Sequence, residues 1–436
     1  MQSDPATVPV TLVDWLDYQQ RVHPHAIELG LERVHAVWQR LGAPVPAPVV
    51  ITIGGTNGKG STVAFLEAML RAAGQRVGAY TSPHLLRYNE RVRVCGCDAG
   101  DAALVDAFER IESARDDIAL TYFEYGTLAA LWMFSQSELD VALLEVGLGG
   151  RLDAVNIIDA DAAIVTTIDL DHQDWLGNDR DSIGREKAGI FRAGRPAIVG
   201  ESDPPIGLLD AAHRIGADLR RAGRAFHYSR ASEGSWRWSA DQVELSLPLP
   251  QLTAPAQLAN GACAIAALHA LRERIGWHPL AIAAGVANAR LAARLQRFGG
   301  DPALIVDVAH NPQAARMLAE WLRGTVATGR TLAVFGALGD KDVRGIFTAL
   351  AGTIDTWFLG GLERESPRGL DVAALARLTV ASPLAHEGIR LHADIDAALA
   401  AAWAEARRGD RVIAFGSFFV AAAALQFAQT RGLAAG

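Results

Sequence analysis

Short apolar runs that are typical of β-strands alternate with helical patterns along most of this chain. The first run, Val49 to Ile53, is followed by a helical stretch from Ser61 to Ala73 and by a second run, Val77 to Tyr80. This alternation predicts a parallel sheet with helices on both faces, because the connection between two parallel strands must pack on the sheet. Further strands are expected at Val141–Glu145, Ala162–Thr167, Leu304–Val308, Thr331–Phe335, Thr356–Leu359 and Arg411–Phe415.

The chain is long enough for two domains. Its 436 residues exceed the usual size of a single hydrophobic core. A second cycle of strands and helices begins near Asp301, after a helical region has given way to Gly299-Gly300. We therefore expect a larger domain at residues 1–293, a linker at 294–300 and a smaller domain at 301–436. The region from Ser229 to Pro250, rich in Trp and Pro, fits an antiparallel excursion.

Composition argues against several classes of protein. The formal net charge is -8 and the isoelectric point is about 5.9, whereas nucleic-acid-binding proteins usually carry a basic surface. The N-terminus lacks the basic and apolar regions of a signal peptide, and no apolar run reaches the roughly 18 residues of a membrane span. Cys95, Cys97 and Cys263 form neither an even disulfide framework nor zinc-ligand spacing. We expect a soluble, cytoplasmic chain with reduced cysteines.

A glycine-rich loop joins the first expected strand to the first expected helix. Glycines let successive backbone N–H groups face an anion, and the helix N-terminus adds partial positive charge. Lys59 supplies a cation for the β- and γ-phosphates of a nucleotide. A plain glycine-rich turn does not explain a lysine at this place, so we infer phosphate binding. The loop consists of Gly54-Gly55-Thr56-Asn57-Gly58-Lys59-Gly60-Ser61-Thr62.

The loop departs from the usual phosphate-loop pattern in two positions. Ile53 occupies the first glycine position, and Gly60 follows the lysine where a Ser or Thr hydroxyl usually binds magnesium. The metal ligand must therefore come from elsewhere in the chain. Glu145 ends an expected buried strand, where a carboxylate can hold Mg²⁺. The alternative is that Glu145 only caps the turn after the strand.

Other motifs follow the loop in order over nearly the full length. With the loop, they make the chain resemble the folylpolyglutamate synthase/dihydrofolate synthase family, relatives of the Mur ligases. The resemblance implies a Mur ligase-like α/β fold: a P-loop-type parallel-sheet ATPase domain at residues 1–293 and a smaller Rossmann-like domain at 301–436. The motifs are Thr81-Ser82-Pro83-His84-Leu85, Phe123-Glu124, Glu145 to Ala154, Asp171-His172, Glu186 to Ile190, Asp307 to Pro312 and Phe415-Gly416-Ser417-Phe418.

The resemblance implies two Mg²⁺ ions held by Ser82, Glu145, His172 and Lys187, with Lys59, Glu145, His172 and Lys187 as the catalytic set. In the family, the lysine that matches Lys187 is carbamylated by CO₂, which turns a cation into an anion beside the metal. This reaction requires a neutral amine, hence a depressed pKa in a buried site. Without the resemblance, His172 would be a plain loop residue and Lys187 part of a solvated helix face.

The resemblance also implies ATP contacts in both domains. Asn260 lies in a helical pattern and could instead be a helix N-cap. The Pro-Gly that usually precedes the matching arginine is Ala292-Ala293 here, so Arg297 is an alternative to Arg294. Asp307 and His310 directly follow a strand, a frequent place for ligand contacts. The expected ATP-binding residues are Thr56, Asn57, Gly58, Lys59, Gly60, Ser61, Asn260, Arg294, Asp307 and His310.

Two segments match family positions that contact dihydropteroate. Phe123 has a ring that can stack on a pterin, and Asp153 has a carboxylate that can accept hydrogen bonds from pterin nitrogens. By themselves, Phe123 would be a core residue and Asp153 a turn residue. Val308, where many relatives have glycine, resembles the bacterial bifunctional type. The expected substrate-binding residues are Thr121, Tyr122, Phe123, Glu124, Leu152, Asp153 and Ala154.

The expected function is an ATP-dependent ligase. It would add L-glutamate to dihydropteroate, forming dihydrofolate, and to tetrahydrofolate or other folates, through an acyl-phosphate intermediate. We expect a monomer with small-molecule substrates, without nucleic-acid or membrane partners. Three alternatives are a folylpolyglutamate synthase alone, a Mur-type ligase acting on a cell-wall precursor, and an ATP-binding regulatory module.

Overall fold

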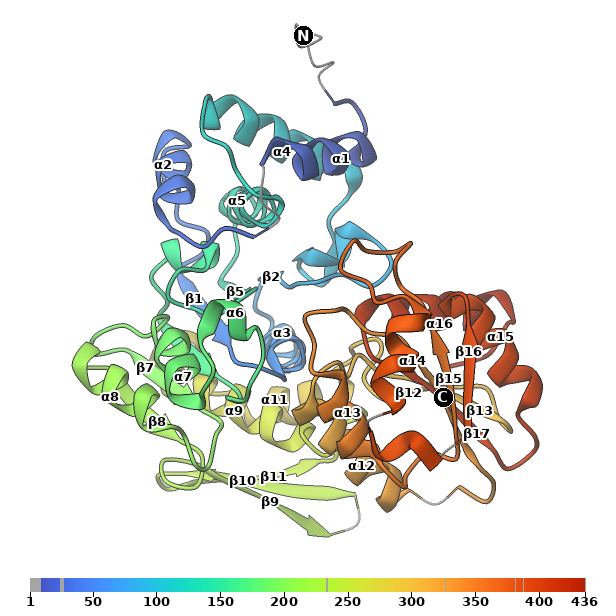
Figure 1. The fold of residues 1–436 in the computed structure, drawn as a ribbon. Coiled ribbons are helices and arrows are strands. Elements are labelled where there is room, and N and C mark those ends of the chain that lie inside the picture. The colour runs from blue at the N-terminus through green and yellow to red at the C-terminus, as the bar shows by residue number, and fades with distance from the viewer. Residues whose placement is uncertain are drawn as a thin grey trace, which may run out of the picture. The chain divides into compact units, whose positions relative to one another are not determined.

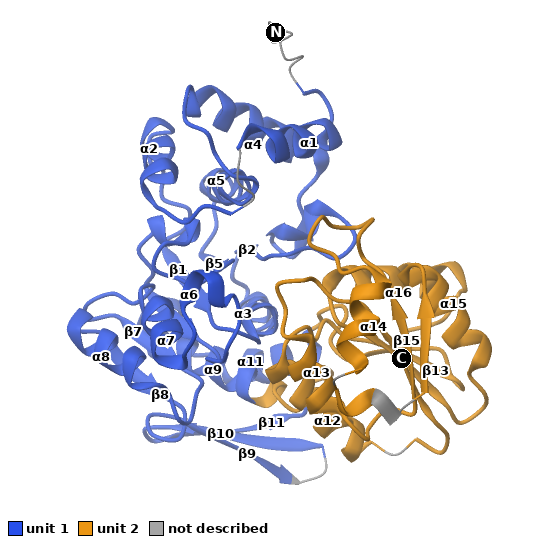
Figure 2. Cartoon of the chain, in the orientation of Figure 1, with its two compact units in different colours: residues 1–249, 259–289 blue, residues 250–258, 290–436 orange. Residues whose placement is uncertain are grey.

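The computed structural model describes residues 9–435 except 24–26, 233, 326, 381 and 387. The chain forms two compact units, which Figure 2 shows in different colours. Unit 1 comprises residues 1–249 and 259–289, and unit 2 comprises residues 250–258 and 290–436. Each unit has a parallel-rich sheet of its own, with helices packed on it.

Within the described residues, unit 1 contains an eight-stranded sheet (Figure 1). Its strand order is β4-β3-β2-β5-β1-β6-β7-β8. The strands from β2 to β8 in this order run parallel, whereas β3 and β4 form an antiparallel extension at one edge. The strands are β1 (Val49–Gly54), β2 (Val77–Tyr80), β3 (Val92–Val94), β4 (Cys97–Asp98), β5 (Val141–Glu145), β6 (Ala162–Val165), β7 (Pro196–Val199) and β8 (Asp218–Arg221).

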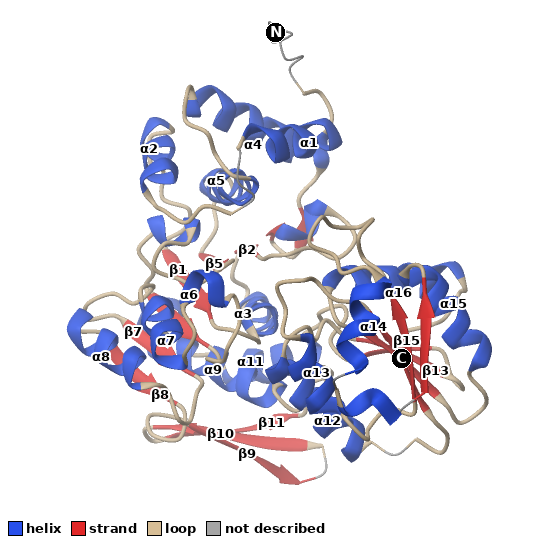
Figure 3. Cartoon of the chain, viewed as in Figure 1, coloured by secondary structure: helices blue, strands red, loops and turns tan. Residues whose placement is uncertain are grey.

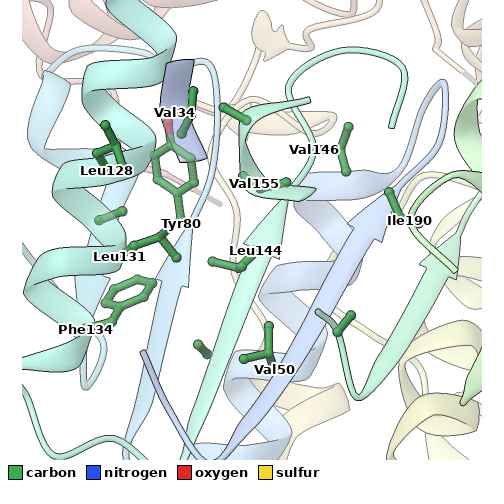
Figure 4. Close-up of a cluster of buried hydrophobic side chains, with 14 of the residues drawn as sticks. Val34, Val50, Tyr80, Leu128, Leu131, Phe134, Leu144, Val146, Val155 and Ile190 are labelled. Carbon is green, nitrogen blue, oxygen red and sulfur yellow. The ribbon is translucent and has the colours of Figure 1, made fainter. Parts of the chain in front are cut away.

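Helices cover both faces of this sheet, which explains why β1 is buried along its whole length. On one face, Val50, Tyr80 and Leu144 face Leu128 and its neighbours on α5 (Figure 4). On the other face, α3 packs against β1, β2 and β5, and α11 packs on α3. The helices around the first face are α1 (Leu12–Val22), α2 (Glu32–Arg40), α4 (Asp101–Arg115), α5 (Tyr122–Ser135), α7 (Arg180–Ala188) and α8 (Ile206–Ile215). The others in unit 1 are α3 (Lys59–Ala72), α6 (Gln173–Leu176), α9 (Gln257–Ala270, of which residues 257 and 258 belong to unit 2), α10 (Arg272–Ile275) and α11 (Pro279–Asn288), with the short 3₁₀ turns η1 (Tyr88–Arg91) and η2 (Ala154–Ile157).

The Trp-rich region of unit 1 forms an antiparallel three-stranded sheet, which confirms the expected excursion. Trp236 and Trp238 on β10 are fully buried, and the exposed Arg237 lies between them. The indole Nε1 of Trp238 donates to the carbonyl oxygen of Ala262 on α9 at 3.2 Å, which ties the sheet to the unit. The strands are β9 (His227–Ser232), β10 (Ser235–Ala240) and β11 (Val243–Pro248).

Unit 2 has a six-stranded sheet in the described residues, with the order β12-β13-β17-β14-β15-β16 (Figure 3). Its strands run parallel except β12, which pairs antiparallel with β13. The strands are β12 (Gln296–Phe298), β13 (Ala303–Val306), β14 (Thr331–Phe335), β15 (Thr356–Gly360), β16 (Gly388–His392) and β17 (Arg411–Phe415). The helices are α12 (Pro312–Gly324), α13 (Val343–Leu350), α14 (Val372–Val380), α15 (Ile395–Glu405) and α16 (Phe418–Thr430), with the 3₁₀ turn η3 (Pro383–His386).

The expected α/β class, with a large parallel-rich sheet and a second C-terminal sheet, is confirmed. α5 begins at Tyr122, before the apolar run from Gly126 to Phe134 that would indicate it, because Thr121 and Glu124 form a capping box at its N-terminus. The segment expected as a linker, residues 294–300, lies in unit 2 and contains β12. In the described part of the chain, no helix is long and apolar enough to span a membrane.

Candidate active site

The phosphate loop connects β1 to α3 and takes its shape from glycines and from the end of β6. Gly55 has a φ of 139°, and a Cβ there would lie 1.9 Å from the hydroxyl of Thr166, so only glycine fits. The backbone N–H of Thr56 donates to the carbonyl oxygen of Thr167 at 2.8 Å, and that of Asn57 to the hydroxyl of Thr167 at 3.0 Å. These bonds hold the loop at the N-terminus of α3, the arrangement expected of an anion site.

Lys59 and Asn260 lie against this loop. The ammonium of Lys59 donates to the carbonyl oxygens of Gly55 at 3.1 Å and Thr56 at 3.3 Å, which curls the side chain over the loop. A Cβ on Gly58, whose φ is 89°, would lie 2.4 Å from Oδ1 of Asn260 on α9. The structure therefore brings Asn260 to the phosphate loop, although the two are far apart in the sequence.

Glu145 and Ser82 meet at the ends of two neighbouring parallel strands. Glu145 is the last residue of β5, and Ser82 follows β2, the strand paired with β5. The backbone N–H of Ser82 donates to Oε2 of Glu145 at 3.1 Å. Glu145 is 5% exposed, and a carboxylate and a serine hydroxyl are hard oxygen donors of the kind that Mg²⁺ prefers.

Lys187 is a buried lysine on α7, with an exposed fraction of 3%. Burial, and then the positive charge of Lys59, lower the pKa of Lys187 to about 7, against the opposing influence of Asp171 and Asp153. His172 adopts a left-handed conformation with a φ of 53° at the start of α6, and its Nε2 lies 3.9 Å from a carboxylate oxygen of Asp171. Among the described residues, no three His, Cys, Asp or Glu side chains form a group that could hold a metal ion.

The two segments expected to bind the pterin lie together in unit 1. A Cβ on Gly147 would lie 2.6 Å from the ring of Phe123, so the ring packs directly on this glycine. The next residue, Leu148, donates its backbone N–H to Oδ2 of Asp153 at 2.8 Å. Burial raises the pKa of the Asp153 carboxyl to about 6, although backbone N–H groups oppose the shift. Phe123 also lies 6.0 Å from Tyr80 between ring centroids.

A third segment, residues 27–33, contacts both of these segments and was missed by the sequence analysis. The backbone N–H of Gly30 donates to the carbonyl oxygen of Leu152 at 3.3 Å. The guanidinium of Arg33 donates to Oε1 of the buried Glu124 at 2.9 Å, while Oε2 of Glu124 accepts from the backbone N–H of Thr121 at 2.7 Å. Both carboxylate oxygens of Glu124 are thus hydrogen-bonded within the protein, to Arg33 and to the backbone of Thr121. No local pattern in residues 27–33 predicts these contacts, because their partners are about a hundred residues away.

The residues expected in unit 2 gather around Phe418. The Arg294 guanidinium lies 5.8 Å from the ring centroid of Phe418, and the His310 ring lies 6.1 Å from it. Burial raises the pKa of Asp307, against the opposing charge of Arg294, and its carboxylate accepts the backbone N–H of Leu295 at 2.8 Å. Arg297, the alternative to Arg294, donates instead to the carbonyl oxygen of Gly300 at 3.2 Å.

This fold and these groups define the class of Mur-type ligases. Two family models match the chain: the Mur ligase middle domain over residues 53–267, and the Mur ligase glutamate ligase domain over residues 293–418. Together they span the phosphate loop, the Glu145 and Lys187 positions, and the Asp307 to Phe418 cluster.

Comparison with individual proteins narrows this class to one family. The dihydrofolate synthase/folylpolyglutamate synthase of Escherichia coli is 48% identical over 422 residues, which cover 96% of each chain. The structure of E. coli FolC in complex with DHPP and ADP has a TM-score of 0.90 at 47% identity, covering 98% of this chain and 99% of that one. A bifunctional folylpolyglutamate synthase/dihydrofolate synthase with Mn, AMPPNP and L-glutamate bound has a TM-score of 0.88 at 45% identity, covering 98% of this chain and 100% of that one. The chain belongs to the dihydrofolate synthase/folylpolyglutamate synthase family.

Proposed function

We propose that this protein is an ATP-dependent ligase with both activities of its family. It joins L-glutamate to dihydropteroate, forming dihydrofolate, and adds further glutamates to tetrahydrofolate or related folates. The observation that carries the proposal is one continuous edge of the unit 1 sheet, where the Lys59 loop, the Ser82–Glu145 pair and the Phe123–Asp153 segments lie. The similarity to the E. coli protein extends over 96% of both chains, so the whole ligase architecture is accounted for.

ATP and a divalent cation fit the residues of this edge. The Lys59 ammonium sits on the carbonyl oxygens of Gly55 and Thr56, beside a loop whose backbone N–H groups suit an anion. The adjoining Ser82 and Glu145 supply the oxygen ligands for one Mg²⁺. We assign a second Mg²⁺ to His172 and to Lys187 in its carbamylated form. Loss of the Lys187 proton near neutral pH supports this assignment, because only the neutral amine reacts with CO₂.

The remaining site residues receive their proposed roles from their positions. The Thr121 to Glu124 and Leu152 to Ala154 segments bind the pterin, with the ring of Phe123 stacked on it and Asp153 accepting its N–H groups. Gly30 and Arg33 hold these two segments through hydrogen bonds to Leu152 and Glu124. The ATP contacts are Thr56, Asn57, Gly58, Lys59, Gly60, Ser61 and Asn260 in unit 1, and Arg294, Asp307 and His310 in unit 2.

In the proposed mechanism, a carboxylate oxygen of the pteroyl or folyl substrate attacks the γ-phosphorus of ATP, and the bond to the β,γ-bridging oxygen breaks. The products of this step are an acyl phosphate and ADP. Lys59 offsets the charge that accumulates on the transferring oxygens. Bound Mg²⁺ would supply further charge neutralisation at the phosphates. The amine of L-glutamate then attacks the acyl carbon, loses a proton, and phosphate leaves as the amide bond forms.

The proposed organisation has an ATP-binding ligase domain at residues 1–293 and a Rossmann-like domain at 301–436, with the boundary segment 294–300 providing β12. We propose a monomeric, cytoplasmic enzyme whose partners are its small-molecule substrates. The presence of a parallel-rich sheet in each unit supports this two-domain organisation.

The test is ADP release by the full chain with ATP, Mg²⁺ and L-glutamate, offering dihydropteroate and tetrahydrofolate separately. We expect glutamate-dependent turnover with both, and transfer of ¹⁸O from a labelled substrate carboxylate to phosphate, as an acyl phosphate requires. Turnover with tetrahydrofolate alone would leave a folylpolyglutamate synthase. Turnover with neither would contradict the folate assignment and favour a cell-wall precursor, and release of unlabelled phosphate would contradict the acyl phosphate.

A further inference from the structure

The loop that carries Ser82, residues 81–87, is shaped by the 3₁₀ turn η1 that follows it. Residues 81–87 have no helical or strand structure of their own. The loop nevertheless reaches the Glu145 carboxylate, through the backbone N–H of Ser82 at 3.1 Å. Its conformation therefore decides where the Ser82 hydroxyl lies relative to Glu145, the two groups proposed to hold Mg²⁺.

The carboxylate of Glu90 accepts three consecutive backbone N–H groups of this loop. Oε2 accepts from Leu85 at 2.7 Å, and Oε1 accepts from Leu86 and Arg87, each at 2.8 Å. Successive N–H groups that converge on one anion form a nest, which usually binds a phosphate or another external anion. Here the carboxylate of Glu90 occupies the nest, and its negative charge holds residues 85–87 together.

The first half of the loop is fixed by the same short turn. The backbone N–H of Thr81 donates to the carbonyl oxygen of Arg91 at 2.8 Å, and the Thr81 hydroxyl donates to the carbonyl oxygen of Glu90 at 3.4 Å. The Nε of Arg91 donates to Nδ1 of His84 at 2.9 Å. Ser82 is therefore flanked by two fixed residues, Thr81 and His84. The residues held by Glu90 begin immediately after His84.

Arg91 also links the turn η1 to α5, the helix proposed to bind the pterin. Its guanidinium lies 5.3 Å from the ring centroid of Tyr88 and 5.4 Å from that of Tyr122, in the first turn of α5. Arg91 is 8% exposed, so these contacts form within the unit and away from bulk water. The turn that holds the Ser82 loop is thus packed against the segment proposed to bind the substrate.

We propose that Glu90 is a positioning residue for the metal site: its carboxylate holds residues 85–87 and thereby keeps Ser82, whose backbone N–H donates to Glu145, in place as a metal ligand. In this role Glu90 acts through the backbone of residues 85–87, to which its carboxylate is hydrogen-bonded. Groups that orient metal ligands typically change metal affinity by about 10–100-fold when they are replaced. Because Ser82 and Glu145 are ligands only within the proposed ligase, this inference rests on the proposed function.

The decisive variant is Glu90→Gln, which keeps the size of the side chain. An amide has one carbonyl oxygen, and its NH₂ group would face a backbone N–H of the nest, donor against donor. We expect Mn²⁺ to bind the full-length variant at least about tenfold more weakly in the presence of AMP-PNP, as followed by electron paramagnetic resonance. The Mg²⁺ concentration for half-maximal turnover should rise by a similar factor, while the KM for L-glutamate changes less.

Two further variants separate positioning from a general loss of structure. Glu109→Gln makes the same chemical change on the exposed face of α4 and should leave Mn²⁺ affinity unchanged. Glu90→Asp keeps the charge but is too short to reach all three N–H groups, so its Mn²⁺ affinity should fall between wild type and Glu90→Gln. If Glu90→Gln does not fold, Glu90→Asp decides the question by itself.

Wild-type Mn²⁺ affinity in folded Glu90→Gln or Glu90→Asp would overturn the inference. So would an equal loss in Glu109→Gln. Failure of the proposed function is a different result, because a wild-type protein without glutamate-dependent turnover can still be compared with its variants by Mn²⁺ binding. A weaker Mn²⁺ site in Glu90→Gln, with the Glu109→Gln control intact, supports the positioning role.

Discussion

At the scale of single residues, the candidate active site is a place where charges are buried close to one another. Glu145, Asp153 and Lys187 are each at most 5% exposed. Burying an ionised group is costly unless partners compensate it, so such groups concentrate at sites where ligand charge completes the balance. Burial, and then the positive charge of Lys59, lower the pKa of Lys187, and the anionic phosphates of ATP would partly offset the effect of Lys59.

Lys187 gives a pH-dependent prediction. With a pKa of about 7, its amine is about nine-tenths neutral at pH 8 and about one-tenth neutral at pH 6. Only the neutral amine adds CO₂, so a carbamate should form at pH 8 and be lost as the pH falls to 6. The measurement is ¹³C NMR with labelled bicarbonate.

The small number of lysines makes the carbamate signal assignable. The chain has three, Lys59, Lys187 and Lys341. Lys187→Met should remove the carbamate resonance, whereas Lys341→Met should leave it. A resonance that persists in Lys187→Met, or that grows as the pH falls from 8 to 6, would show that Lys187 is not the carbamylated group.

At the scale of secondary-structure elements, the phosphate helix depends on a close contact with its neighbour. α3 begins at Lys59, and α11 packs on it so tightly that a Cβ at Gly285 would lie 2.4 Å from the Cα of Met69. Gly261, in the interior of α9, is different, because a Cβ there would meet ordinary contacts at 3.8 Å. Close packing therefore requires glycine at position 285 but not at position 261.

These two glycines form a matched pair of substitutions. Gly285→Ala must push α11 away from α3, and we expect the free energy of unfolding to fall by about 1–3 kcal/mol. Gly261→Ala fits without strain and removes a helix-weakening glycine, so the free energy of unfolding should rise by about 0.5–1 kcal/mol. Urea denaturation measures both. Equal effects of the same sign would contradict the packing described for α3 and α11.

At the scale of the whole molecule, the parts that were predictable from the sequence are those encoded by neighbouring residues. Strand and helix alternation indicated the parallel sheets, and the glycines around Lys59 indicated a loop between the first strand and the first helix of the sheet. Caps shifted some helix limits, as Thr121 does for α5. The family resemblance supplied roles that spacing alone did not, including those of His172 and Lys187.

The contacts that the sequence did not reveal join residues that are distant in the chain or that lack a recognisable pattern. Gly30 contacts Leu152 and Arg33 contacts Glu124 across about a hundred residues of chain, so the residues next to them in the sequence give no signal of either contact. Residues 250–258 belong to unit 2 although they lie within the sequence of unit 1. The expected division has a single boundary near residue 293 and does not include this crossing of the chain. The nest around Glu90 is short-range but matches no familiar motif.

The last prediction concerns the stability of the whole chain with nucleotide. A ligand that binds only the native state stabilises it, by about 2.7 kcal/mol at a hundred times its Kd. We expect AMP-PNP with Mg²⁺ to raise the urea midpoint of the wild-type chain and to have little effect on Lys59→Ala. Without nucleotide, Lys59→Ala should unfold close to the wild-type midpoint, since the hydrogen bonds described for the lysine go to the loop carbonyl oxygens of Gly55 and Thr56 and its positive charge lies near that of Lys187.

Arg71→Ala is the matched control, because it removes one positive charge from the same helix, at the opposite end of α3 from the phosphate loop. If ATP were attracted only by the overall positive charge of α3, removing one charge in either variant would reduce the stabilisation by nucleotide. A phosphate site built around Lys59 weakens it in Lys59→Ala alone, because the helix N-terminus and the loop N–H groups act over short distances. If Lys59→Ala keeps the full stabilisation, the loop is not the nucleotide site, and the edge of the unit 1 sheet loses its central role in the proposed ligase.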